Sequence, residues 1–120
     1  MKNITHSIVE IFCINLKPGA GASFHKLYIE RSVPLQKQWK VGLLAYGPSL
    51  HDEDVYWVVR QYKDLADREQ SQDAFYGSDD WKLGPREEIL ALIETYTTVV
   101  VPANTALLEG LSLLNWSENL

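Results

Sequence analysis

Two stretches of the sequence have the pattern of β-strands that are apolar on both faces. Residues 8–16 (IVEIFCINL) and 55–62 (VYWVVRQY) carry apolar side chains at both odd and even positions, so neither face of such a strand suits contact with water. A sheet built on these strands needs a covering layer on each side. A chain of 120 residues has the length of one domain, and it offers too few helices to cover both faces.

The remaining segments follow a βαββαβ order. The pattern predicts strands over residues 8–16, 41–46, 55–62 and 95–101, and helices over about 22–34, 64–76 and 84–94. We expect Pro34 to end or kink the first helix because proline has no N–H group. This order predicts a ferredoxin-like α+β protomer: a four-stranded antiparallel sheet with its helices on one face and the first and third strands in the centre.

The uncovered second face of this sheet predicts self-association. Two such sheets packed face to face form a dimeric α+β barrel, so we expect a homodimer. We expect one domain over residues 1–120 with its core over 8–102. The tail, 103–120, contains several large apolar residues and is expected to form a short helix that docks on its own domain or on the partner; these residues are Leu107, Leu108, Leu111, Leu114 and Trp116.

Composition limits the classes of partner. The net charge is −5, which argues against nucleic acid and against an anionic membrane surface, since both attract basic proteins. No apolar run approaches the roughly 20 residues of a membrane-spanning helix. Cys13 is the only cysteine, and the N-terminus is a poor match to a signal peptide. We therefore expect a cytoplasmic protein in a reducing compartment.

Charged residues at positions expected to be buried are the first candidates for a site. Arg31 lies on the apolar stripe of the first predicted helix, and Arg68 faces inward on the second, with Gln72 nearby. A buried charge needs a partner, and Glu10 and Arg60 on the central strands need one as well. One interpretation is that these charges, together with Glu69, pair only with one another. The other is that Arg68, Arg31 and Gln72 face a cavity, where arginine binds a carboxylate through two parallel hydrogen bonds.

Several aromatic residues are candidates for the wall of such a cavity. We select Tyr28, Tyr46 and Trp57 as ligand-binding residues, although most aromatic side chains in a chain of this size belong to the core or to an interface. His25 follows Phe24 on the first helix and is expected to face solvent. It is also the one weak candidate for a catalytic acid or base, because imidazole titrates near neutral pH.

Other motifs indicate no cofactor or metal. Gly19-Ala20-Gly21 lies between a strand and a helix, but Phe24 occupies the third glycine position of a dinucleotide loop. The helix start is expected to accept at most an anion. His6, His25 and His51 do not have the spacing of metal ligands. Cys13 is expected to be a small buried apolar residue.

The chain resembles the NIPSNAP family of the dimeric α/β barrel superfamily over residues 8–102. The resemblance rests on IVEIFCINLKPGAGASF at 8–24, Pro34, RQYKDLADRE at 60–69, Asp80-Trp81 and VVVP at 99–102. It implies a ferredoxin-like protomer and a homodimer. It implies little about chemistry, because many members have no assigned activity, and fold alone does not transfer the monooxygenase or haem-related roles of other members of the superfamily.

We therefore expect a homodimeric protein that binds a small organic ligand, anionic or aromatic, in a cavity between helices and sheet, without a cofactor. One alternative is a cofactor-independent monooxygenase that uses His25 as a base. Another is a structural or interaction protein with no true pocket. The sequence does not identify the ligand or establish catalysis.

Overall fold

A computed structural model describes residues 7–114 of the chain. Their elements are β1 (Ser7–Leu16), α1 (Gly21–Leu27), the π-helical turn η1 (Tyr28–Ser32), α2 (Val33–Gln38), β2 (Leu43–Pro48), β3 (Val55–Tyr62), α3 (Leu65–Tyr76), α4 (Asp79–Lys82), α5 (Arg86–Leu90), β4 (Ile93–Ala103) and α6 (Thr105–Ser112). The predicted βαββαβ order is confirmed, with a helix added at the C-terminal end. No helix within the described residues has the length and apolar character needed to cross a bilayer.

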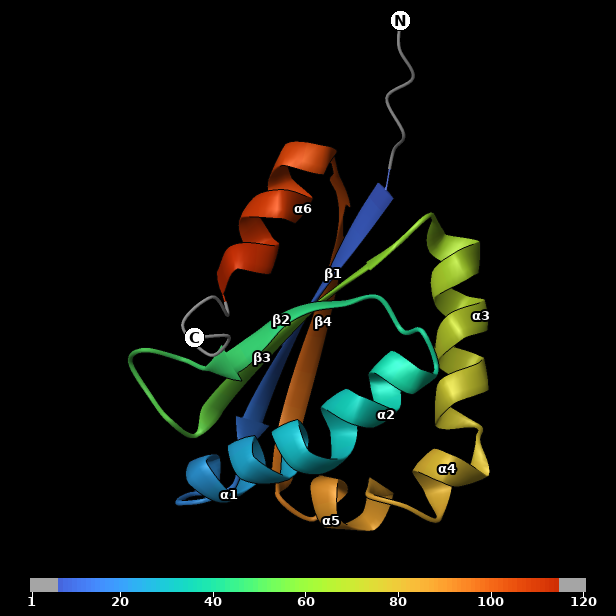
Figure 1. Cartoon of the computed structure of the whole chain (residues 1–120). Helices are drawn as coiled ribbons and strands as arrows, with labels where there is room; N and C mark the ends of the chain where they lie inside the picture. The colour runs from blue at the N-terminus through green and yellow to red at the C-terminus, as the bar shows by residue number, and fades with distance from the viewer. Residues whose placement is uncertain (1–6, 115–120) are drawn as a thin grey trace, which may run out of the picture.

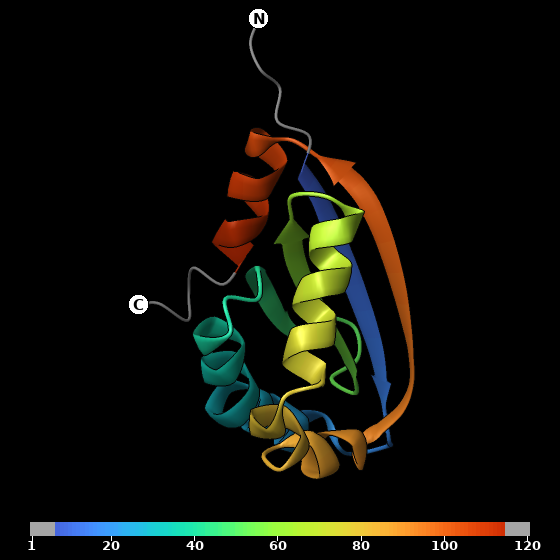
Figure 2. The same ribbon diagram turned by 90° about the vertical axis from the view of Figure 1, so that its right-hand side faces the viewer.

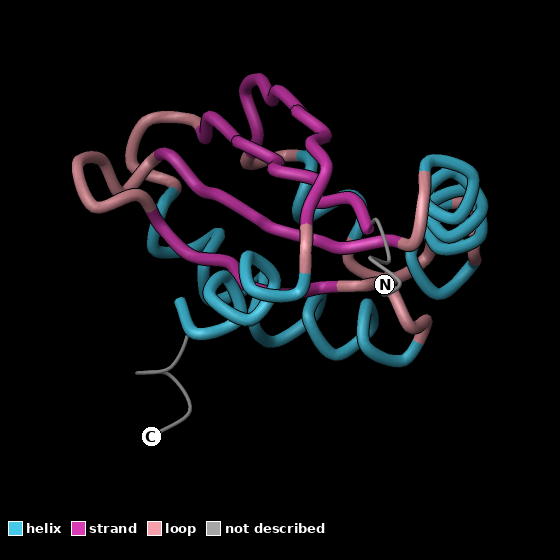
Figure 3. The backbone as a smooth tube through the Cα atoms, turned by 90° about the horizontal axis from the view of Figure 1, so that it is seen from above, coloured by secondary structure: helices cyan, strands magenta, loops and turns pink. Residues whose placement is uncertain are grey.

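The four strands form one antiparallel sheet in the order β2-β3-β1-β4 (Figure 1). The two strands with two apolar faces, β1 and β3, are central as predicted. Figure 3 shows from above how strongly the strands twist relative to one another. The register places Glu10 of β1 directly opposite Arg60 of β3, which brings opposite charges together on neighbouring central strands.

The first helical segment is continuous over residues 21–38 and contains a π-helical turn. At η1 the N–H of Val33 donates to the carbonyl of Tyr28, one residue further back than in an α-helix. Pro34 follows directly after Val33. Because proline has no N–H group to donate, one helical hydrogen bond is missing there, and the wider turn accommodates this gap. Pro34 therefore does not end the helix, which continues to Gln38. Of the two effects expected of Pro34, ending the helix or kinking it, the kink takes the form of this π-helical turn.

Element boundaries follow caps and strand pairing. Asp64 caps α3 as predicted, since its carboxylate accepts a hydrogen bond of 2.8 Å from the N–H of Asp67. The last predicted helix ends earlier, at Leu90, and β4 begins at Ile93. A bulge beside Leu16 lets the end of β1 pair with Ile93, which draws residues expected to be helical into the strand. Figure 2 shows α3 lying along the sheet and β4 curving at its edge.

The main core lies between the sheet and the helices α1 to α5. Its buried side chains come from β1, β3 and every helical segment of that layer; they include Ile14, Phe24, Tyr28, Tyr56, Tyr62, Phe75 and Trp81. This is the face on which the even-numbered residues of β1 lie.

The other face is partly covered by the chain's own tail. Leu108 and Leu111 of α6 pack against Val9, Val59 and Ala103, and Figure 1 shows α6 and α3 on opposite sides of the strands. In this structure α6 packs on its own domain, which is one of the two docking places expected for the tail. The expectation that the chain leaves this face without any cover is wrong for this half of the sheet, because the periodicity of the strands does not reveal where a C-terminal helix packs.

The rest of that face remains open. Ile11 is 39% exposed and its register partner Val99 is 51% exposed, while Cys13, expected to be buried, is an exposed free thiol. Trp116, part of the predicted tail, lies outside the described residues.

The turn between β2 and β3 closes the start of α1. The carboxylate of Asp54 accepts hydrogen bonds of 2.9 Å from the N–H groups of Gly19 and of Gly21. A Cβ on Gly21 would lie 1.9 Å from the carbonyl oxygen of Glu53, so only glycine fits there. The anion expected at this helix start is thus a side chain of the protein itself.

Candidate functional site

A cavity of about 590 Å³ lies between the helical layer and the sheet. Strands β1, β3 and β4 form one wall, while α1, η1, α3 and the α4–α5 segment form the others. The lining combines aromatic and apolar side chains (Phe12, Ile14, Phe24, Tyr28, Tyr76, Trp81, Ile89, Leu90, Ile93 and Tyr96) with polar and charged ones (Glu10, Ser32, Arg60, Arg68, Gln72, Lys82, Arg86 and Thr98).

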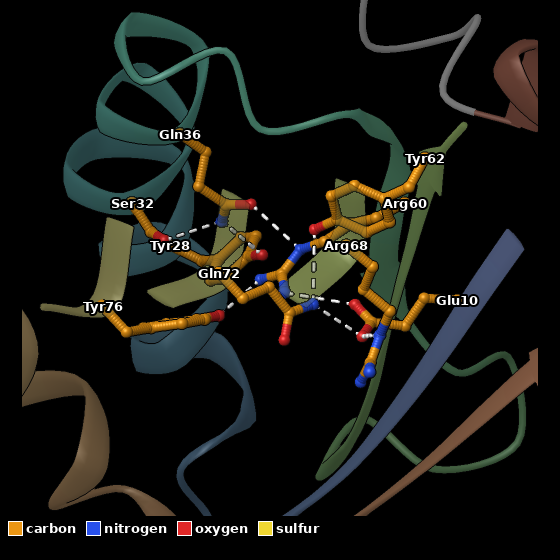
Figure 4. A network of polar contacts seen from close by, with 9 residues as sticks. All are labelled: Glu10, Tyr28, Ser32, Gln36, Arg60, Tyr62, Arg68, Gln72 and Tyr76. Atoms are coloured by element: carbon orange, nitrogen blue, oxygen red, sulfur yellow. Dashed lines mark hydrogen bonds and ion pairs between the residues drawn. The ribbon is translucent and has the colours of Figure 1, made fainter. Parts of the chain in front are cut away.

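Glu10 is the centre of a polar network at one end of this cavity (Figure 4). The residue is 1% exposed. Its Oε1 accepts a hydrogen bond of 3.3 Å from Nη1 of Arg60, and its Oε2 accepts bonds of 2.7 Å from Nε of Arg68 and from Nε2 of Gln72. Sheet register supplies Arg60, and α3 supplies Arg68 and Gln72, which lie one turn apart on the same helix face.

Arg60 connects this carboxylate to the first helical segment. Its Nε donates to Oε1 of Gln36 at 3.2 Å and its Nη2 donates to the hydroxyl of Tyr76 at 2.8 Å. The guanidinium carbon lies 5.7 Å from the ring centroid of Tyr76 and at the same distance from that of Phe12, within cation–π range. Arg60 is 4% exposed, so all of its recorded partners lie in the protein interior.

The side chain of Arg60 remains cationic despite its burial. Desolvation lowers the pKa of Arg60, but attraction to the oxygens of Tyr76, Tyr28 and Tyr62 and to the Glu10 carboxylate outweighs it, so the pKa lies above its ordinary value. Burial also keeps the neighbouring phenols of Tyr28 and Tyr62 in their neutral form. Burial raises the pKa of Tyr28 and that of Tyr62, although the positive charge of Arg60 opposes the rise.

The π-helical turn places the next part of the network. Nε2 of Gln36 donates to the hydroxyl of Tyr28 at 2.7 Å and to Oγ of Ser32 at 3.0 Å. One residue added by the turn moves the inward positions of the helix from 31 and 35 to 32 and 36. Ser32 and Gln36 are accordingly buried, and Arg31 is rotated outward.

Three of the six predicted ligand-binding residues line the cavity: Arg68, Gln72 and Tyr28. The predicted inward position of Arg31 is wrong, because the π-helical turn shifts the helix face. Arg31 forms a surface ion pair of 3.0 Å with Glu88, and the two side chains are 46% and 60% exposed. The interpretation that the buried charges pair with one another holds for Glu10, Arg60 and Arg68.

Tyr46, Trp57 and the catalytic candidate His25 also lie outside the cavity lining. The placement of Trp57 there is wrong, because Trp57 pairs in register with Cys13 on the opposite face of the sheet, and its indole N–H donates to the carbonyl of Pro48 at 3.2 Å. Tyr46 lies on the helical side, with its ring centroid 5.8 Å from that of Tyr28. His25 is half-buried, with Nδ1 2.7 Å from the hydroxyl of Tyr56.

Sequence reasoning missed five polar contributors: Ser32, Gln36, Tyr76, Lys82 and Arg86. The spacing of Arg68, Gln72 and Tyr76, four residues apart each time, could have identified Tyr76. Ser32 and Gln36 could not be found without knowledge of the π-helical turn. Within residues 7–114 no group of three or more His, Cys, Asp or Glu side chains is arranged to hold a metal ion.

Comparison with known proteins gives a structural likeness. The sequence matches no protein-family model, and no curated protein matches it significantly. Among solved structures, a NIPSNAP family protein of unknown function from Agrobacterium tumefaciens superimposes with a TM-score of 0.76 at 21% identity, covering 83% of this chain and 90% of that one. A NIPSNAP-like domain protein from Burkholderia xenovorans gives 0.74 at 19% identity, covering 81% and 84%.

A more distant neighbour comes from Bacteroides thetaiotaomicron, and its name assigns it to the antibiotic biosynthesis monooxygenases. It gives a TM-score of 0.61 at 12% identity, covering 79% of this chain and 87% of that one. Identities this low compare folds and not activities. The resemblance inferred from the sequence is thus confirmed in three dimensions: this chain has the ferredoxin-like α+β fold of the NIPSNAP family proteins.

Proposed function

We propose that the protein binds a small organic molecule in the cavity between its helices and its sheet. The observation that carries this proposal is an interior space of about 590 Å³, which lies within the range of roughly 300–1,000 Å³ typical of ligand pockets. Aromatic side chains, among them Phe12, Trp81 and Tyr96, form much of the wall. A structural protein of this size would be expected to fill such a space, so binding is favoured over a purely structural role.

The monooxygenase alternative receives less support. Abstraction of a proton from a phenol or an enolisable carbon needs a base within hydrogen-bond distance. The lining contains no histidine or cysteine, and its one carboxylate, Glu10, already accepts hydrogen bonds from three side chains. His25, the predicted base, is not part of the lining. We therefore propose a binding protein rather than an enzyme of this class.

Titration with neutral probes tests the proposal. We expect 2-naphthol and 1-decanol to shift the methyl NMR signals of Ile89 and Ile93, which line the cavity. Thr98→Trp fills the space and should abolish these shifts. Leu83→Trp, at an exposed position outside the lining, is the control and should preserve them. Absence of shifts with every probe, or binding to the Thr98→Trp variant equal to that of the natural protein, would contradict the proposal.

We also propose that the protein forms a homodimer through the open part of the sheet. Ile11 and Val99 are large apolar residues exposed side by side on that face, and such a patch favours association. Val99→Glu should yield monomers in analytical ultracentrifugation at micromolar concentration. Leu83→Glu, which alters an exposed leucine away from the sheet, should leave the dimer intact. A natural protein that sediments as a monomer would refute this proposal.

We place the protein in the cytoplasm, and the support is its cysteine content. Cys13 is its one cysteine and is exposed as a free thiol, the state favoured in a reducing compartment. Cell fractionation tests this location, since the protein should be recovered in the cytoplasmic fraction, and recovery with secreted or membrane material would contradict the proposal.

A further inference from the structure

We propose that the ligand of this cavity is an organic carboxylate, bound through the donors that the polar end leaves available: the hydroxyls of Tyr28 and Tyr76 and the terminal nitrogens of Arg68. This inference rests on the proposed binding function and specifies its ligand class. It follows from the polar groups that the protein leaves available, from the charge of the lining and from the apolar character of the opposite wall.

The two phenols are donors without a protein acceptor. The oxygen of Tyr28 accepts a hydrogen bond from Nε2 of Gln36 at 2.7 Å, and that of Tyr76 accepts one from Nη2 of Arg60 at 2.8 Å. A hydroxyl that accepts in this way still has its own proton to donate. Among the described residues, neither proton is given to a protein acceptor, so both are available to an acceptor on a ligand.

Arg68 contributes a larger group of available donors. An arginine has five N–H donors, and Arg68 uses only Nε, which donates to Glu10 at 2.7 Å. In the part of the chain that the structure describes, its Nη1 and Nη2 have no hydrogen-bond acceptor. Figure 4 shows this end of the side chain directed away from the glutamate. These two nitrogens form the planar fork that matches the two oxygens of a carboxylate.

Arg60 does not offer donors to a ligand in this way, since each of its three nitrogens already donates to a protein acceptor: Gln36, Glu10 or Tyr76. It holds the Tyr76 hydroxyl in place and supplies a fixed positive charge behind it. The donors of this polar end thus exceed its acceptors, and a ligand completes it best by bringing oxygen acceptors without donors of its own. A carboxylate does so, whereas an amine adds only further donors.

The charge of the lining favours an anion. Four cationic side chains, Arg60, Arg68, Lys82 and Arg86, line the cavity with the single carboxylate of Glu10. Arg86 also pairs with Glu87 at 2.7 Å outside the lining, so two positive charges remain in surplus in a chain whose net charge is −5. In the described part of the chain Lys82 has no ion-pair partner. The cavity is therefore a local positive region on an acidic protein, and it attracts an anion that the protein as a whole repels.

The far side of the cavity sets the rest of the ligand. Ile89, Leu90, Ile93 and Tyr96 give it an apolar surface, next to the cationic Lys82 and Arg86 of the α4–α5 segment. An apolar body is favoured against such a wall. A carboxylate head with a hydrocarbon or aromatic body satisfies both the polar end and this apolar surface, while an inorganic anion satisfies only the polar end.

Isothermal titration with matched probes tests the ligand class. The panel comprises hexanoate, octanoate, decanoate and phenylbutyrate, each with the alcohol and the amine of the same skeleton. We expect the best carboxylate to bind at least about tenfold more tightly than its alcohol, the size of one charge-assisted hydrogen bond, and the amine to bind most weakly. Equal binding of alcohol and carboxylate, or tightest binding of the amine, would overturn the carboxylate class and leave the proposed binding function intact. No binding by any member would overturn both.

Conservative variants test the assigned donors. Tyr28→Phe, Tyr76→Phe and Arg68→Lys should each reduce the preference for carboxylate over alcohol by about tenfold. The controls make the same changes outside the lining: Tyr62→Phe, whose hydroxyl accepts from Gln72, and Arg31→Lys on the surface should keep the full preference. If all three cavity variants keep it as well, the assignment of these donors is overturned. The comparison of probes on the natural protein stands even if a variant fails to fold.

Discussion

Replacement of Glu10 by glutamine tests the physical basis of the buried network. Glu10→Gln preserves the shape of the side chain and removes its charge. Either orientation of the new amide turns one oxygen into an NH₂ group. In one orientation that group faces the donor of Arg60, and in the other it faces the donors of Arg68 and Gln72. At least one N–H···O bond is therefore replaced by two donors in contact.

The cost follows from burial. Side chains of Glu10 and Arg60 are 2% and 5% exposed in their ion pair, and removal of one partner of a buried pair costs about 3–5 kcal/mol of the free energy of unfolding. For a domain of this length that loss lowers the melting temperature by roughly 10–25 °C. The pair Arg31–Glu88 has a similar distance, 3.0 Å, but lies at the surface, so Glu88→Gln should cost about 1 kcal/mol or less.

Urea unfolding of the two variants and the natural protein, at one protein concentration, measures both losses. The concentration is fixed because a dimer links stability to association. A loss for Glu10→Gln below about 1 kcal/mol, or equal to that of Glu88→Gln, would mean that water solvates the carboxylate and that burial does not make this network strong.

Three further changes have defined outcomes. Gly21→Ala should destabilise the fold by about 3 kcal/mol or more in urea unfolding, because the new Cβ meets the carbonyl oxygen of Glu53 at 1.9 Å. Burial raises the pKa of Tyr28 and of Tyr62, so the unfolded state loses these protons first and the free energy of unfolding should fall as pH rises above about 10; Tyr28→Phe should make this fall shallower in urea titrations across alkaline pH. Leu108→Ala should cost about 1–3 kcal/mol if α6 is docked in solution, and an unchanged unfolding midpoint would mean that it is not.

The architecture could be predicted because its strongest signals are local. The apolar pattern on both faces of residues 8–16 and 55–62 placed them correctly in the centre of the sheet. Central strands are covered on both faces, whereas an edge strand leaves one of its backbone edges open to solvent. Asp64 marked the start of α3 because a carboxylate at that position satisfies a free N–H group of the first turn. The docking place of α6 was not predictable in this way, since a leucine pattern indicates that a helix packs but not against which surface.

The candidate site was predictable only where the helix period is regular. Arg68 and Gln72 lie on α3, an uninterrupted helix, and both line the cavity. Arg31 lies within the π-helical turn, where a single added residue exchanges an inward for an outward position. Trp57 was misplaced for another reason: a strand with two apolar faces does not reveal which face meets the helices, and only the register with β1 decides it.

The C-terminal helix bears on how the proposed dimer would be built. With α6 in place, the large exposed residues on the open part of the sheet are Ile11 and Val99, which supply far less than the roughly 800 Å² that a stable interface buries on each partner. The missing area lies on α6 and just beyond it, since Leu107 and Leu113 are 43% and 64% exposed while Leu108 packs inward. A helix that is apolar on both sides needs a second cover. A second copy of the chain that contacts α6 and the open sheet together provides this cover. Leu107→Glu should therefore dissociate the proposed dimer as effectively as Val99→Glu in ultracentrifugation. Dissociation by Val99→Glu alone would instead place the partner on the sheet without the helix.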